Sequence, residues 1–136
     1  GVQSVASPFL YAIFTHGSQY GVVELESLAD GLAGAVEESS ITIPLARRLV
    51  DDFVLVTEDQ ISRAVAYAWQ KHGEMIEGSG AVGLAAVMSG VIEKRRPEEG
   101  PLVIVITGGN IQPEVHARLC GYPHMDDASR ESSSAR

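Results

Sequence analysis

The sequence predicts an α/β fold: a three-layer, open, mostly parallel sheet with helices on both faces. The strongest sign is the run 102–106, five apolar and mainly β-branched residues with no polar alternation. Such a strand has both faces covered, as in a parallel sheet with helices on either side. Residues 53–56 form a second run of this kind, and a helix with a 3.6-residue apolar stripe follows them.

Length and charge limit the possible classes of protein. The 136 residues fit one domain, and ten basic against eighteen acidic residues give a net charge of −8. This balance argues against a nucleic-acid or anionic-membrane partner. No apolar run is long enough for a membrane span, and the N-terminus lacks the pattern of a secretory signal. A single cysteine, Cys120, excludes an internal disulfide and makes the cytoplasm the expected compartment.

In the first part of the chain we expect two helices and little other regular structure. Apolar spacing predicts a helix over 5–16, and a second, short helix is expected over 43–50. Residues 22–25 fit a short extended piece. The small apolar residues of 28–36 suit close packing better than a free helix.

The middle of the chain carries the clearest local signals. After the strand at 53–56, Thr57 and Gln60 form a capping box for a helix that Gly73 ends. Residues 79–92 are apolar almost all round, so this helix should be central.

The last part of the chain begins with a charged surface turn over 93–99, which leads to the strand at 102–106. The pattern fades after Arg118, and the polar residues of 121–136 are typical of a disordered tail.

Two segments could carry a binding site. The four residues 107–110, Thr-Gly-Gly-Asn, follow a predicted buried strand directly, where α/β sheets bind ligands. Their glycines allow backbone amides to approach a ligand, and Thr107 and Asn110 can form hydrogen bonds. A plain β-turn is the alternative.

The second segment, 77–83, contains a formal G-x-G-x-x-G. A dinucleotide-binding loop would need a strand before it, and 71–76 is the end of a helix. The glycines could instead allow close packing of a buried helix. A third interpretation places Glu77 and Ser79 against a ligand at the helix N-terminus.

The remaining polar residues give weaker signals. The acidic residues of 26–31 suit a buried partner or a helix cap. Cys120 lacks the surroundings of a nucleophile. The four histidines are expected to be structural or to lie at the surface: His16, His72, His116 and His124. Both lysines, Lys71 and Lys94, are expected to lie in polar surroundings.

Five segments in order resemble one family. They match its motifs E-T-I-A-D-G, P-x-x-R-x-L-V-D-D, V-x-V-[ST]-[ED]-[ED]-x-I, E-P-[ST]-[GA]-A and V-[LV]-S-G-G-N at residues 26–31, 44–52, 54–61, 77–81 and 105–110. The order and spacing, over about residues 1–112, resemble the C-terminal half of threonine/serine dehydratases and serine racemases. These are pyridoxal-phosphate (PLP) enzymes of the tryptophan synthase β fold type.

The resemblance implies that residues 1–120 are the C-terminal part of a PLP-enzyme catalytic domain. The implied reaction is α-proton removal and β-elimination of a small hydroxy-amino acid, giving a 2-oxo acid and ammonia. Thr107 would bond the pyridine nitrogen of PLP, Glu77 would line the pocket, and Gly108, Gly109 and Asn110 would form its wall. The alternatives are a racemase of the same family and a non-catalytic ligand-binding domain.

Departures from the family pattern limit what this chain is expected to do alone. The family's Schiff-base lysine and glycine-rich phosphate loop lie upstream, so this chain should hold no catalytic residue and be inactive alone. Its partner would be the missing N-terminal half, and the complete enzyme is expected to be a homodimer. Gln3 and Phe9 replace acidic residues that help some members hold a cation, so no metal is expected. An exposed sheet edge should favour self-association. Gly78 replaces the usual proline.

Overall fold

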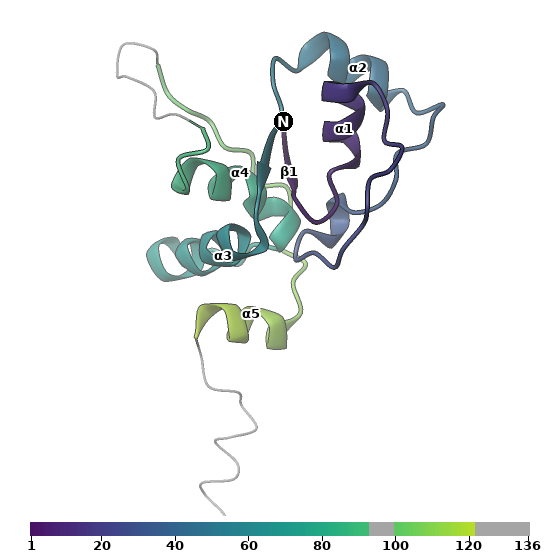
Figure 1. The fold of residues 1–136 in the computed structure, drawn as a ribbon. Coiled ribbons are helices and arrows are strands. Elements are labelled where there is room, and N and C mark those ends of the chain that lie inside the picture. Colours follow the sequence, from purple (N-terminus) through teal and green to yellow (C-terminus); the bar gives the residue numbers. More distant parts are fainter. Residues whose placement is uncertain (93–99, 122–136) are drawn as a thin grey trace, which may run out of the picture.

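The computed structural model describes residues 1–92 and 100–121. The charged turn predicted at 93–99 and almost all of the predicted tail therefore lie outside the described residues. The elements, in chain order (Figure 1), are β1 (Val2–Ser4), α1 (Phe9–His16), the short 3₁₀ turn η1 (Asp30–Leu32), α2 (Thr42–Leu49), β2 (Val54–Val56), α3 (Glu58–His72), α4 (Gly78–Met88) and α5 (Pro113–Cys120).

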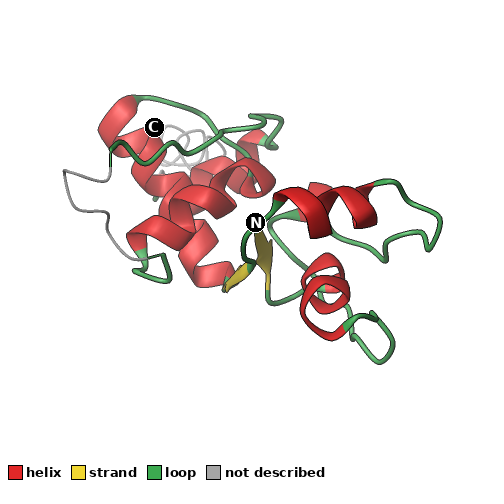
Figure 2. Ribbon diagram, turned by 90° about the horizontal axis from the view of Figure 1, so that it is seen from above, coloured by secondary structure: helices red, strands yellow, loops and turns green. Residues whose placement is uncertain are grey.

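The two short strands separate two groups of helices. β1 and β2 pair in parallel, with Val2 opposite Val54 and Ser4 opposite Val56. Helices α1 and α2 lie on one side of the strands, and α3, α4 and α5 lie on the other (Figure 2). The α/β class and the parallel pairing are confirmed, but the described sheet is smaller than expected.

The prediction of a strand at 102–106 is wrong for this chain. These residues are irregular and belong to no described β-ladder. Ile104 packs on α4, because a Cβ added at Gly83 would lie 3.0 Å from its Cγ2 atom. Val103 and Val105 are 77% and 72% exposed. A strand is stabilised by backbone pairing with a neighbour, and no described strand lies alongside this segment.

Both helices expected in the N-terminal part of the chain form, with shifted boundaries. The first helix begins at Phe9, because residues 5–8 turn the chain away from β1: the Val5 N–H donates to the carbonyl of Val56, and the Ala6 N–H donates to Ser4 Oγ. The extended piece expected at 22–25 is irregular, with the Leu25 N–H bonded to the carbonyl of Ala6.

The hydrophobic core lies between the strands, α3 and α4. Helix α4 is central, as predicted, since its residues are buried on most sides. The core cluster consists mainly of small and β-branched side chains: Ala29, Val56, Ile61, Ala64, Val65, Ala68, Ile76, Ala81, Val82, Ala85 and Ala86. The small residues let α3 and α4 pack closely against each other.

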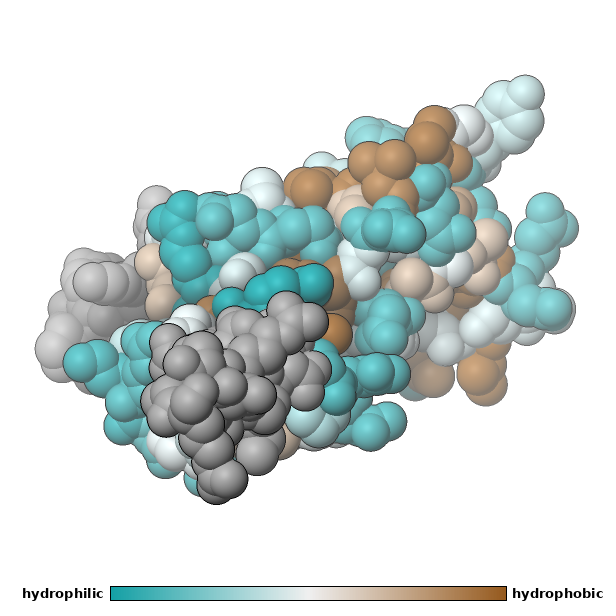
Figure 3. Space-filling model, turned by 90° about the horizontal axis from the view of Figure 1, so that it is seen from below, coloured by the Kyte–Doolittle hydropathy of each residue, from teal (hydrophilic) through white to brown (hydrophobic). Residues whose placement is uncertain are grey.

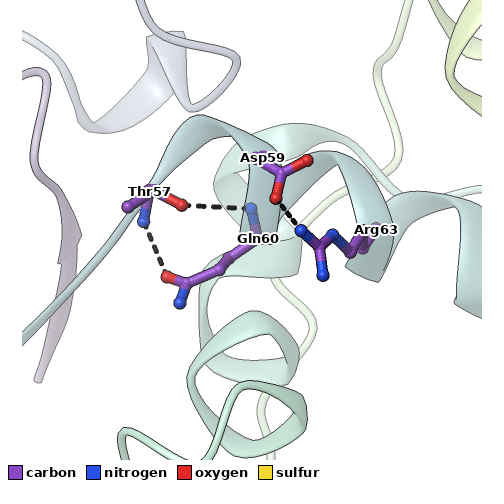
Figure 4. A network of polar contacts seen from close by, with 4 residues as sticks. All are labelled: Thr57, Asp59, Gln60 and Arg63. Atoms are coloured by element: carbon purple, nitrogen blue, oxygen red, sulfur yellow. Dashed lines mark hydrogen bonds and ion pairs between the residues drawn. The ribbon is translucent and has the colours of Figure 1, made fainter.

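Helix α3 starts at the predicted capping box (Figure 4). The Gln60 N–H donates to Thr57 Oγ1, and Gln60 Oε1 accepts from the Thr57 N–H. Asp59 and Arg63, one turn apart, form an exposed ion pair beside it. Gly73, with a φ of +69°, ends the helix as predicted.

Helix α5 was not anticipated. Pro113 occupies its first turn and Gly121, with a φ of +76°, follows its last residue. These are ordinary helix start and stop signals. The helix packs on α3, with the His116 ring set edge-on to Trp69 at a centroid distance of 5.2 Å.

The described surface is mixed. Seen from below, mainly hydrophilic residues are interrupted by separate hydrophobic patches (Figure 3). Within residues 1–92 and 100–121, no helix combines the length and hydropathy of a membrane span.

Removal of the α3 cap should weaken the fold. We expect Thr57→Ala to lower the free energy of unfolding by about 1 kcal/mol, because one N-terminal N–H of α3 loses its partner. Urea denaturation measures this change. The control is Arg63→Ala, which breaks only the exposed ion pair and should cost at most about 0.5 kcal/mol. Equal losses in both variants would show that the cap is not the stabilising contact.

Candidate functional site

The predicted site residues meet at the first turn of α4. Glu77 precedes this helix, and its backbone N–H donates to the carbonyl of Gly108 at 3.1 Å. Its carboxylate accepts from the Asn110 N–H, with 3.0 Å between Oε2 and the nitrogen. Glu77 therefore binds the loop 107–110 at two points and sets its position against α4.

Glycines allow the loop 107–110 to approach α4 closely. A Cβ added at Gly80 would lie 2.7 Å from the carbonyl oxygen of Gly108, and one added at Gly108 would overlap the Glu77 carboxylate. At the start of the helix, Gly78 lies directly against the carbonyl of Leu28. The G-x-G-x-x-G thus serves close packing, one of the alternatives left open by the sequence. Irregular residues, not a strand, precede it.

A groove of 430 Å³ runs from β1 to the segment 102–107 (Figure 1 shows both). Its floor is α4, through Val82, Gly83 and Val87. Ser79 and Thr107 lie at the end near the α4 N-terminus. Thr107 is exposed, whereas the Ser79 hydroxyl is buried beside Gly31 and has no hydrogen-bond partner within the described part of the chain.

A second polar junction, which the sequence analysis missed, centres on Glu58. This first residue of α3 accepts hydrogen bonds from the hydroxyl groups of Ser4 and Ser27 at Oε1 and from the Leu28 N–H at Oε2. It joins the end of β1, the loop before η1 and the start of α3. The acidic position after Thr57 was visible in the sequence, but its partners, 30 to 54 residues away, were not.

The acidic residues of 26–31 have a minor role. Asp30 begins η1 and its carboxylate accepts only from the neighbouring Gly31 N–H among the described contacts, while Glu26 is exposed. Together with Glu24, Glu58 and others they line an open hollow of 730 Å³. No group of three metal-ligating residues occurs among the described residues.

Gln3, at one of the two positions where some family members carry an acidic residue, makes a hydrogen bond without charge. Its side-chain oxygen accepts from the Tyr11 N–H at 2.7 Å, in the first turn of α1, and the residue is buried. Phe9 is also buried, in the same helix. Neither residue supplies a carboxylate.

The other candidate side chains lie elsewhere. Lys71 is exposed in the last turn of α3, and Lys94 and His124 fall outside the described residues. His116 is buried in α5, where its Nε2 atom lies 3.4 Å from Cys120 Sγ. Burial raises the pKa of the Cys120 thiol, so it stays protonated and is a poor nucleophile.

The groove thus brings the hydroxyl groups of Ser79 and Thr107 together beside the N-terminus of α4, which packs on the parallel strands of an α/β fold. The chain belongs to the family of pyridoxal-phosphate dependent enzymes, whose family model matches residues 1–108.

Individual relatives agree with this assignment. A putative threonine dehydratase of Sinorhizobium fredii is 37% identical over 104 residues, which cover 76% of this chain and 30% of that protein. Rat serine racemase is 40% identical over 86 residues, 63% of this chain and 25% of that protein. L-threonine ammonia-lyase of Thermotoga maritima is 33% identical over 119 residues, 88% of this chain and 28% of that protein.

Solved structures are similar in the same way. Serine racemase from Dictyostelium discoideum has a TM-score of 0.62 at 27% identity, over 80% of this chain and 34% of that one. Maize serine racemase, at 23% identity and a TM-score of 0.68, shows the fold alone and covers 94% of this chain and 37% of that one. The chain thus spans about a third or less of the length of these relatives.

The described residues fit one side of a PLP molecule. The Thr107 hydroxyl is exposed at the groove, where it could donate to a ring nitrogen, and the buried Ser79 hydroxyl lacks a partner among the described residues. No lysine of the described residues lies at the groove, since Lys71 is exposed at the far end of α3. The described residues therefore supply hydroxyl groups that suit the ring of PLP, but no lysine amine at the groove for its covalent attachment.

Loss of the Glu58 carboxylate should loosen the junction. We expect Glu58→Gln to lower the free energy of unfolding by about 1–3 kcal/mol, because an amide nitrogen replaces one of two carboxylate oxygens that accept partly buried hydrogen bonds. Chemical denaturation measures this, with Asp59→Asn as the control on the exposed side of the same turn; it should cost about 0.5 kcal/mol or less. If the junction does not stabilise the fold, both variants should show equally small changes in the free energy of unfolding.

Cys120 should make stability fall in alkaline solution. Burial raises the pKa of its thiol in the folded chain, so above the unfolded value of about 8.5 the folded state holds more protons than the unfolded state. Stability from the neutral thiol is complete below that pH and is lost as pH rises through the folded pKa. The free energy of unfolding of the natural chain should therefore fall more between pH 7 and 10 than that of Cys120→Ala. Parallel pH profiles would contradict the raised pKa.

Proposed function

We propose that this chain is the C-terminal part of a PLP-dependent ammonia-lyase acting on L-threonine, L-serine or a similar small hydroxy-amino acid in the cytoplasm. The observation that carries the proposal is the joint placement of Glu77 and the loop 107–110 at the first turn of α4. Relatives described as L-threonine ammonia-lyase and putative threonine dehydratase support the reaction class.

In this reaction PLP supplies the electron sink, and the protein supplies position and electrostatics. Thr107 would donate its hydroxyl proton in a hydrogen bond to the pyridine nitrogen. A neutral hydroxyl does not force this nitrogen to be protonated, so the ring is a moderate sink that suits elimination. Glu77 would keep Thr107 in place by holding Gly108 and Asn110. Gly109 has to lack a side chain for the loop to keep this position, because a Cβ there would lie 2.5 Å from the carbonyl oxygen of Met75.

The chain alone should be inactive. The described residues include no lysine at the groove, and Thr107, Gly109 and Asn110 are exposed where an active site needs to exclude water. An upstream half of the polypeptide would cover these residues and supply the attachment lysine and the phosphate contacts. The complete enzyme would be a homodimer.

A racemase is the second candidate, because rat serine racemase is 40% identical over 86 residues. Both reactions begin with removal of the α-proton. They are separated by product: a 2-oxo acid with ammonia for the lyase, and the opposite enantiomer of the amino acid for the racemase. A non-catalytic ligand-binding domain would give neither product.

The test is a fusion of this chain to the upstream part of T. maritima L-threonine ammonia-lyase, in place of the segment that matches it. We expect the fusion to bind PLP and release ammonia and a 2-oxo acid from L-threonine or L-serine, while the isolated chain does neither. Thr107→Ala should raise the PLP dissociation constant and lower kcat at least tenfold, because a hydrogen bond to the ring is lost, and Thr107→Ser should retain both.

Three results would contradict the proposal. They are a folded fusion that binds no PLP, a Thr107→Ala variant equal to the parent, and stoichiometric PLP attachment to Lys71 or Lys94 of the isolated chain. The last is read by borohydride reduction and mass spectrometry.

A further inference from the structure

The loop 107–110 is joined closely to α5. Its last residue, Asn110, lies three positions before Pro113, the first residue of that helix. The Ile111 N–H donates to the carbonyl of Gly109 at 2.9 Å, which closes the chain into a tight turn. The three Cα–Cα steps from Asn110 to Pro113 span about 11 Å at most. A displacement of α5 is therefore transmitted to the loop.

Helix α5 depends on α3 for its own stability. It has eight residues, and a helix of this length is marginal in water without tertiary packing. Its main packing partner among the described elements is α3, beneath which it lies in Figure 1. Loss of the contact with α3 would therefore also unwind α5, and the loop would lose its attachment on this side.

The buried face of α5 is built on two residues one turn apart. His116 and Cys120 are 5% and 8% exposed, whereas Glu114 and Arg118 lie on the exposed face. The His116 ring stands edge-on to Trp69 of α3, with an interplanar angle of 88° and a centroid distance of 5.2 Å. Its Nε2 atom lies 3.4 Å from Cys120 Sγ. The imidazole of His116 thus contacts both α3 and the last turn of α5.

We propose that His116 is a positioning residue for the candidate site. By docking α5 on Trp69 it holds the loop 107–110 on its C-terminal side, while Glu77 holds the loop against α4 through hydrogen bonds. The inference rests on the proposed function only for the identity of the ligand, PLP. Because one loop is tied to α5 and also carries Thr107, docking of α5 and binding of a ligand at Thr107 favour each other.

The first test needs no cofactor. It measures hydrogen exchange of the Asn110 amide, which donates to Glu77, in the isolated chain. His116→Ala should raise the exchange rate about tenfold, because the loop opens more often when α5 is undocked. Helix propensity acts in the other direction, since alanine favours a helix more than histidine does. His116→Phe keeps an aromatic ring for Trp69 and should restore slow exchange. Unchanged exchange in His116→Ala, or equally fast exchange in both variants, overturns the proposal.

Two control variants separate positioning from a general loss of stability. Arg118→Ala alters the exposed face of α5, and Ile13→Ala removes a buried side chain from α1, on the other side of the strands (Figure 2). Neither should change the exchange rate of the Asn110 amide, although Ile13→Ala should lower the urea midpoint of unfolding, since it leaves a cavity. An exchange rate that simply follows the urea midpoint in all variants would make His116 a stabilising residue only and overturn the proposal.

The second test uses the fusion described above and measures the PLP dissociation constant. His116→Ala should raise this constant about tenfold, and His116→Phe should keep it near the value of the parent. In return, PLP should slow the alkylation of Cys120, because this buried thiol is reached when α5 leaves α3. Equal PLP binding by the parent and His116→Ala, or an alkylation rate that PLP does not change, contradicts the coupling.

The outcomes separate this inference from the proposed function. A fusion that binds no PLP contradicts the enzyme, while faster exchange of the Asn110 amide in the isolated His116→Ala chain still supports the role of His116. A fusion that binds PLP equally well with and without the His116 ring supports the enzyme and contradicts the positioning role.

Discussion

The first turn of α4 contacts two other stretches of backbone with no side chain between them. Gly78 lies against the carbonyl of Leu28, and Gly80 lies against that of Gly108, so the helix, the loop before η1 and the loop 107–110 share one point of contact. Any side chain at Gly78 or Gly80 would separate them, because backbone atoms cannot yield as a flexible side chain can. The geometry of the candidate site depends on this approach.

Glu58 fixes the loop before η1, the stretch of backbone that Gly78 contacts. The Ser27 hydroxyl and the Leu28 N–H both donate to its carboxylate, and this fixes the backbone that Gly78 packs on. Its place in the first turn of α3 favours a negative charge, since the helix dipole is positive there. Two carboxylates, Glu58 and Glu77, thus hold the two loops against α4 from opposite sides.

The sequence predicted best what is determined locally. The cap at Thr57, the stop at Gly73 and the buried helix at α4 each depend on residues within one or two turns. The segment 102–106 was mispredicted because its pattern describes a strand with neighbours, and the described chain contains none beside it. The flanking Pro113 and Gly121 could have indicated α5. At the site, Glu77 contacts Gly108 and Asn110, which only the resemblance to a family had grouped with it. The partners of Glu58 are too distant along the chain to be foreseen.

Among the described contacts, the loop 107–110 is held to the rest of the chain by hydrogen bonds to one residue, Glu77. The residues around it are irregular from 100 to 112. Its anchorage can therefore open while the core of α3 and α4 stays folded, at a free energy well below that of global unfolding. A ligand that contacts both α4 and Thr107 would bind only the closed form, so its affinity would be reduced by the fraction of open molecules. Whatever strengthens the Glu77 contacts would then tighten binding without touching the ligand.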